Sequence, residues 1–139
     1  MTTTAPGHLS TLLAPGPALL RISLRLDAVV TAANGLAYLA LSGPIESLLG
    51  LDRAVGIPIG IFLTLYGIGV ALVGLPAQIN TTAVRTVIAG NTAWVVLSLA
   101  AVFVIGLDLT VVGGVWGVLQ AIVVGGFAAM QYAGLQRAR

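Results

Sequence analysis

Four polar side chains lie along one apolar stretch, Leu26 to Ala40, at positions that could share a helix face. They are Asp27, Thr31, Asn34 and Tyr38, separated by four, three and four residues. This spacing places side chains on one side of an α-helix. The stripe therefore indicates the inward-facing side of a first helix, graded from an interfacial Asp27 to a buried Asn34.

Two further amide side chains, Asn91 and Gln120, lie deep in other apolar segments. Together with Asn34 and nearby aromatic residues they could line a cavity for a small ligand or a lipid headgroup. They could equally hold the helices together, because amides hydrogen-bond across helices in membranes. The candidate ligand-binding residues are Asn34, Tyr38, Asn91, Trp94 and Gln120.

Asp27 is an ionisable residue in a membrane segment, which makes it a functional candidate, for instance as a proton-coupling group. It lies near the same end of its segment as Arg85 does in the third apolar segment, and only two residues after Arg25. Since an unpaired buried charge is costly, we expect an ion pair of Asp27 with Arg85 or Arg25.

The sequence lacks the residues that several other kinds of chemistry require. The chain has no cysteine and a single histidine, His8, so disulfides, thiol chemistry and a metal or haem held between two histidines of one chain are excluded. It has no Ser/His/Asp set, no carboxylate pair in one span, no P-loop and no HExxH motif. We therefore expect no catalytic residues, no metal, no cofactor and no enzyme activity.

The composition is that of an integral membrane protein. Of 139 residues 58% are hydrophobic and 7% are charged, and the mean hydropathy is +1.09. Soluble domains average about 25% charged residues. The net charge of +2 comes from few, scattered groups, which argues against a nucleic-acid partner. The lipid bilayer is the expected environment.

Four segments are long and apolar enough to cross a bilayer, which needs roughly 20 such residues. They span about 17–42, 56–75, 84–106 and 111–135, between an N-terminal tail of 1–16 and a C-terminal tail of 136–139. The first ends at Gly43-Pro44, and "PIESLLGLDRAV" after it predicts a short interfacial helix. The predicted fold is all-α, a bundle of four transmembrane helices.

Arginines set the expected orientation. One side of the predicted topology holds Arg21, Arg25, Arg85, Arg137 and Arg139, whereas the other holds Arg53 alone. The positive-inside rule then places both termini in the cytoplasm and the protein in the cytoplasmic membrane.

An internal repeat divides the chain into two helical hairpins. Asn34 recurs as Asn91, "GLD" at 50–52 recurs at 106–108, and the Gly56-Gly60 pair recurs as Gly113-Gly117, at shifts of 56 or 57 residues. Two-helix units repeated in tandem are parallel, so they predict a pseudo-twofold axis along the membrane normal. The four glycines predict close helix packing, within the chain or at a homodimer face.

Three segments carry a resemblance to known proteins: "LRLDAVVTAANGLAYL", "LLGLD" and "VIAGNTAW". With four short spans, they resemble a group of small actinobacterial integral membrane proteins of unknown function, over roughly Arg21 to Arg137. More distantly, "LLG" after the first span and a Gly-rich second span are similar to the DoxX-like superfamily. The resemblance implies an architecture and no site.

Two functions remain open. The sequence favours a non-enzymatic structural or accessory subunit, with a homodimer or a membrane complex as partner. The alternative is a carrier or binding protein for a small apolar or weakly polar molecule, such as a lipid or a quinone, within the bundle. A cavity of roughly 300 Å³ or more at the candidate residues would favour the alternative.

Overall fold

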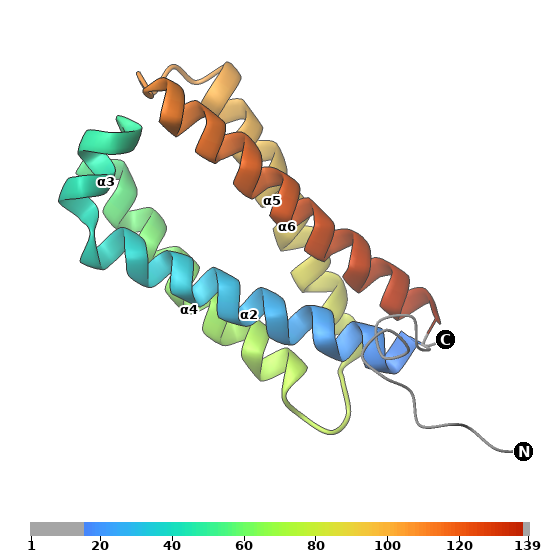
Figure 1. Ribbon diagram of the computed structural model, residues 1–139. Helices are drawn as coiled ribbons and strands as arrows, with labels where there is room; N and C mark the ends of the chain where they lie inside the picture. Colours follow the sequence, from blue (N-terminus) through green and yellow to red (C-terminus); the bar gives the residue numbers. More distant parts are fainter. Residues whose placement is uncertain (1–15, 138–139) are drawn as a thin grey trace, which may run out of the picture.

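The computed structural model describes residues 16–137, and the regular secondary structure of this part of the chain is all helix. Its five helices are α2 (Gly16–Ala40), α3 (Ser42–Leu49), α4 (Arg53–Gly74), α5 (Thr81–Phe103) and α6 (Val111–Arg137) (Figure 1). The predicted all-α class is confirmed. The predicted tails lie outside the described residues, except for Gly16 and for Gln136 and Arg137, which belong to α2 and α6.

Three helices, α4, α5 and α6, are each long and apolar enough to cross a membrane. The fourth candidate span is α2 taken with α3, two helices that meet at a bend of 93°. Charged residues in the first half of α2, namely Arg21, Arg25 and Asp27, lower its own hydropathy. Residues 16–137 thus hold three to four candidate spans.

The bend lies at Leu41 and not at the predicted Gly43-Pro44. Pro44 is the third residue of α3, and the first turn of a helix tolerates proline because its N–H groups have no intrahelical partner. The proline therefore belongs to the start of the short helix and not to the end of the span.

Two helical hairpins make up the bundle: α2 packs along α4, and α5 packs along α6 (Figure 1). The hairpins meet where α2 contacts α6, whereas α4 and α5 barely touch. A strict twofold axis would make these two contacts equivalent. The hairpins are therefore splayed apart on one side, and the predicted pseudo-symmetry is broken there.

Glycines set the close approach of α4 to α2. A Cβ atom at Gly67 would lie 2.7 Å from the backbone nitrogen of Ala32, and one at Gly60 would lie 2.9 Å from the Tyr38 side chain. Gly56 is also buried and faces Tyr38 and Leu51. In lipid, such small-residue contacts supply the packing that holds helices together.

The glycines of α6 have different neighbours. A Cβ atom at Gly113 would collide with the Leu49 carbonyl group at the end of α3. One at Gly117 would lie 2.5 Å from the Val102 side chain of α5. Both glycines thus occupy contacts within the chain.

Arg21 and Arg25 stabilise the carboxyl end of α4. Arg21 donates hydrogen bonds to the carbonyl oxygens of Pro76 (2.5 Å) and Ala77 (2.7 Å). Arg25 Nε donates to the carbonyl oxygen of Gly74 at 3.1 Å. Cations suit this position because the last carbonyl groups of a helix lack intrahelical partners and carry partial negative charge.

The opposite end of the bundle is closed by the two "GLD" segments. Gly50 and Gly106 have nearly identical left-handed backbones, with φ of 72° and 73°, a conformation that glycine adopts readily. Leu51 and Leu107, which follow them, pack in one apolar cluster. The Thr110 N–H also donates to the Leu49 carbonyl oxygen at 3.0 Å, which ties α3 to the start of α6.

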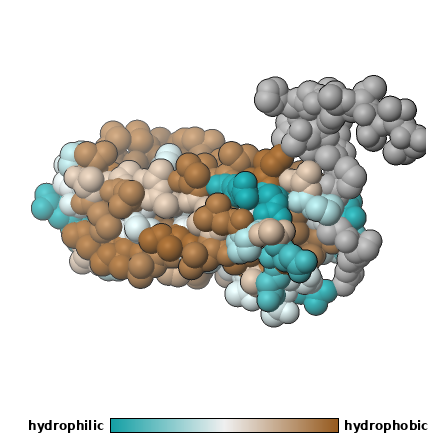
Figure 2. Space-filling view, turned by 90° about the horizontal axis from the view of Figure 1, so that it is seen from below, coloured by the Kyte–Doolittle hydropathy of each residue, from teal (hydrophilic) through white to brown (hydrophobic). Residues whose placement is uncertain are grey.

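The surface matches a membrane environment. Large apolar side chains are exposed along every long helix, and they include Val29, Leu65, Leu72, Leu97 and Ile122. Figure 2 shows this apolar surface over most of one face, with hydrophilic residues mainly toward the two ends of the molecule. Such a surface is compatible with lipid contact rather than water.

Candidate binding cavity

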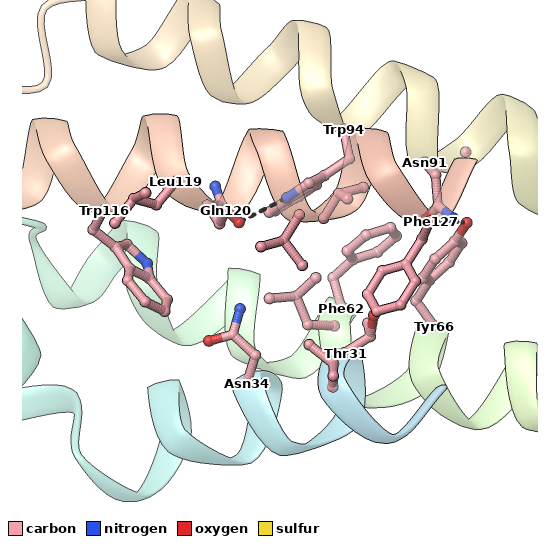
Figure 3. Close-up of a pocket in the computed structure, with 15 residues that line it drawn as sticks. Thr31, Asn34, Phe62, Tyr66, Asn91, Trp94, Trp116, Leu119, Gln120 and Phe127 are labelled. Carbon is pink, nitrogen blue, oxygen red and sulfur yellow. Dashed lines mark hydrogen bonds between the residues drawn. The ribbon is translucent and has the colours of Figure 1, made fainter. Parts of the chain in front are cut away.

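A cavity of about 390 Å³ lies between the two hairpins. All four long helices line it (Figure 3), with Val30, Thr31 and Asn34 from α2, Phe62, Leu63 and Tyr66 from α4, Gly90, Asn91 and Trp94 from α5, and Trp116, Leu119, Gln120, Val123, Val124 and Phe127 from α6. It arises because α2 and α4 diverge from α5 and α6 beyond their contact at one end.

The cavity opens toward the lipid-facing surface. Five of its lining residues are also exposed: Val30 by 45%, Phe62 by 49%, Trp116 by 38%, Leu119 by 52% and Val123 by 48%. Val30 belongs to α2, Phe62 to α4 and the other three to α6. The cavity therefore reaches the apolar surface on both hairpins.

Asn34 points from α2 into the space between α2 and α6 (Figure 3). It is half-buried, and none of the hydrogen bonds within residues 16–137 involves its side chain. The other amides on the wall, Asn91 and Gln120, are bonded to protein groups. The Asn34 amide is therefore the polar wall group that a guest molecule can use, as a donor and as an acceptor.

The floor of the cavity is a buried hydrogen-bond network around Asp27, which is fully buried. Its carboxylate accepts hydrogen bonds from Thr31 Oγ1 (2.8 Å), Asn91 Nδ2 (2.8 Å) and Gln131 Nε2 (2.7 Å). Asn91 Nδ2 also donates to Gln131 Oε1 at 3.0 Å. These bonds join α2, α5 and α6, and three donors share the two oxygens of the carboxylate.

The ion pair expected between Asp27 and Arg85 is not formed. Arg85 is exposed on α5, between the buried Val84 and Val87, and so faces away from the network. Arg25 is engaged with the end of α4. Neutral amides and a hydroxyl group satisfy the carboxylate instead. Within residues 16–137 the ion pair that is present joins Arg53 to Glu46, at 3.3 Å.

Asn34 and Asn91, equivalent in the repeat, do not bond each other. Asn91 belongs to the floor network, where its Oδ1 accepts from the Tyr66 hydroxyl group at 3.2 Å. Asn34 lines the cavity without a protein partner. The broken symmetry explains this difference, because α2 contacts α6 on one side while α4 and α5 stay apart on the other.

Trp94, Trp116 and Gln120 separate this cavity from a second one of about 290 Å³, which extends toward α3. Trp94 Nε1 donates to Gln120 Oε1 at 3.0 Å, and Gln120 Nε2 donates to Ser98 Oγ at 2.9 Å. Trp116 Nε1 donates to the Tyr38 hydroxyl oxygen at 2.8 Å. The structure thus places all five candidate residues on the walls of two adjoining cavities.

An aromatic wall completes the first cavity. The Phe62 ring stacks on Tyr66 and on Trp94, with ring centroids 5.5 Å and 5.8 Å apart. A Cβ atom at Gly90 would lie 2.6 Å from the Tyr66 hydroxyl oxygen, so glycine allows Tyr66 to reach α5. Phe62 was not among the site residues predicted from the sequence, although its spacing of four from Tyr66 puts both rings on one helix face.

Apart from Asn34, the polar side chains that line the cavity are bonded to protein groups. Across the described helices, no three side chains of His, Cys, Asp or Glu type lie close enough together to hold a metal ion. The polar groups of the floor are bonded to one another. The wall offers an apolar, aromatic enclosure with one available amide.

Comparisons with protein-family models, with curated proteins and with solved structures found no match. They lend no support to the resemblance to small actinobacterial membrane proteins or to the DoxX-like superfamily. The established description is a small helical protein with three to four candidate membrane spans.

Proposed function

We propose that this protein binds a small lipophilic molecule with one carbonyl or hydroxyl group in the cavity between its hairpins. The observation that carries the proposal is the cavity of about 390 Å³, which reaches the apolar surface and is lined by the unbonded Asn34 amide. Small-molecule sites typically enclose about 300–1,000 Å³, with mostly apolar walls and a few placed polar groups.

The side chains that line the cavity indicate the class of ligand. Apolar and aromatic side chains dominate the lining, so burial of apolar surface drives binding. Asn34 can donate to a carbonyl oxygen or accept from a hydroxyl group. Since the opening faces lipid, the guest enters from the bilayer, and a quinone-like or alcohol-bearing lipid fits both conditions.

A structural or accessory role has less support. Gly56, Gly60, Gly113 and Gly117 pack inside the chain, so they do not supply a homodimer face. The proposal also includes membership of the actinobacterial group and a non-catalytic role. The first rests on the quoted sequence segments and the second on the residue types of the site.

Both tryptophans of the chain, Trp94 and Trp116, line the cavity, so intrinsic fluorescence reports on its occupancy. A short-chain alkyl benzoquinone titrated into nanodiscs that hold the protein should quench this fluorescence saturably. Val124→Phe, which places a larger ring at the wall, should weaken the apparent affinity roughly tenfold, because lost guest contacts of about 1.4 kcal/mol amount to one decade. Asn34→Leu should weaken it by a few-fold.

The matched control is Ile122→Phe, on the same helix but 64% exposed and outside the cavity lining. It should leave the quenching curve unchanged. Quenching that rises linearly with quinone and is identical in wild type and Val124→Phe reflects only collisions in the bilayer. That outcome would refute the proposed site.

We also propose that the first residues of α2 and the last residues of α6 face the cytoplasm, on the arginine distribution alone. The chain has no cysteine, so single cysteines can report the side of each loop. In intact cells an impermeant maleimide should label Asp108→Cys in the loop before α6. It should label Gln78→Cys, in the loop before α5, only after permeabilisation. The reverse pattern would invert the proposed orientation.

A further inference from the structure

A groove of about 420 Å³ lies between α5 and α6, apart from the cavity between the hairpins. It is lined by Arg85, Ile88 and Ala89 of α5 and by Tyr132, Leu135 and Gln136 of α6. Arg85 is the fifth residue of α5 and Gln136 is the last residue but one of α6. The groove therefore begins at the arginine-bearing end of the bundle and runs toward the apolar middle.

Arg85 differs from the arginines that form hydrogen bonds or ion pairs within the protein. Arg21 and Arg25 bind the end of α4, and Arg53 pairs with Glu46. Within residues 16–137 the Arg85 guanidinium group takes part in no hydrogen bond or ion pair. Its positive charge is thus available to an external anion.

The carboxylates of the described chain do not neutralise Arg85. Asp27 is buried and bonded by neutral donors. Glu46, Asp52 and Asp108 belong to the α3–α4 and α5–α6 connections, at the opposite end of the bundle from the start of α5. The local charge of the groove is therefore positive.

Tyr132 supplies a second anion-binding group. Its hydroxyl oxygen accepts a hydrogen bond from Gln136 Nε2 at 2.6 Å. The hydroxyl hydrogen has no acceptor within the described residues, so it can be donated to a phosphate oxygen. The remaining lining residues, Ile88, Ala89 and Leu135, are apolar and suit a hydrocarbon chain.

We propose that this groove binds an anionic phospholipid, with its phosphate group on Arg85 and Tyr132 and an acyl chain along Ile88, Ala89 and Leu135. Basic pockets between transmembrane helices on the cytoplasmic side bind anionic headgroups, and a guanidinium group matches phosphate geometry. A phospholipid fits better than free phosphate because the polar groups adjoin an apolar stretch at membrane depth.

The test uses the full chain in neutral detergent, titrated with dioctanoyl phosphatidylglycerol or dioctanoyl phosphatidylcholine, with bound lipid counted by native mass spectrometry. Wild type should prefer the anionic lipid roughly five- to tenfold, as one arginine contact implies. Arg85→Gln should abolish this preference and leave the affinity for phosphatidylcholine unchanged. Tyr132→Phe should reduce the preference by a smaller factor.

Arg137→Gln has the same net charge as Arg85→Gln and lies at the same end of the bundle, outside the groove lining. It should keep the preference for the anionic lipid. Arg85→Lys should keep part of this preference, which would show that the loss in Arg85→Gln comes from the missing charge and not from a folding defect. Equal affinities for the two lipids would overturn the proposal, as would an equal effect of Arg137→Gln. Inorganic phosphate that displaces the anionic lipid at comparable concentration would assign the groove to free phosphate instead.

Discussion

Replacing Gly67 by alanine should lower the free energy of unfolding by roughly 1–3 kcal/mol, the usual cost of overpacking. The added Cβ atom would lie 2.7 Å from the Ala32 nitrogen and 2.9 Å from the Ala32 Cα atom. Both are backbone atoms, so relief requires α2 and α4 to move apart. Because this contact runs along the main helix pair of the first hairpin, the change should loosen the whole hairpin.

Gly69, two residues further along α4, is the matched control. A Cβ atom there would meet nothing within 4 Å. Gly69→Ala should therefore leave stability unchanged or raise it by up to about 1 kcal/mol, through the better helix propensity of alanine. Unfolding in detergent, followed by circular dichroism, measures both variants. Equal stability of the two would show that α2 and α4 do not approach closely at Gly67.

Asp27→Ala should destabilise the bundle by roughly 2–5 kcal/mol. The change removes the shared acceptor of Thr31, Asn91 and Gln131. Each buried donor left without an acceptor costs about 1–3 kcal/mol, and part of this is offset because a carboxylate no longer has to be buried. The contact between α2 and the α5–α6 hairpin should weaken most.

Leu26→Ala serves as the control, because Leu26 adjoins Asp27 but is 49% exposed. Its effect should stay below about 1 kcal/mol, since partly lipid-exposed side chains lose few protein contacts. Hydrogen exchange of α2 and α6 amides should rise in Asp27→Ala and remain unchanged in Leu26→Ala. An Asp27→Ala protein as stable as Leu26→Ala would mean that the network does not join the hairpins.

Sequence patterns predicted the features that depend only on positions within a single helix. Gly56 and Gly60 fall on one side of a helix by their spacing, and that side contacts α2. Asp27 and Thr31 share the inward face in the same way, and they are bonded to each other. Helical periodicity contains this information, since it depends only on positions along a single segment.

The partners across helices could not be predicted in the same way. Gln131 bonds Asp27 from 104 residues away, because α6 approaches the start of α2 at Gly134. A Cβ atom there would lie 2.8 Å from the Leu20 nitrogen. The repeat suggested equivalent contacts on both sides of the bundle. Unequal packing of α2 on α6 and of α4 on α5 produced both the cavity and the separate roles of Asn34 and Asn91.

The central claim, a guest molecule between the hairpins, is tested most directly by extraction of the protein with its surrounding membrane and native mass spectrometry. Wild type should carry one small molecule per chain in addition to bulk phospholipid. Ile122→Phe should retain this molecule, and Val124→Phe should lose it. A wild-type protein without any such adduct, or an adduct retained equally by Val124→Phe, would contradict the claim.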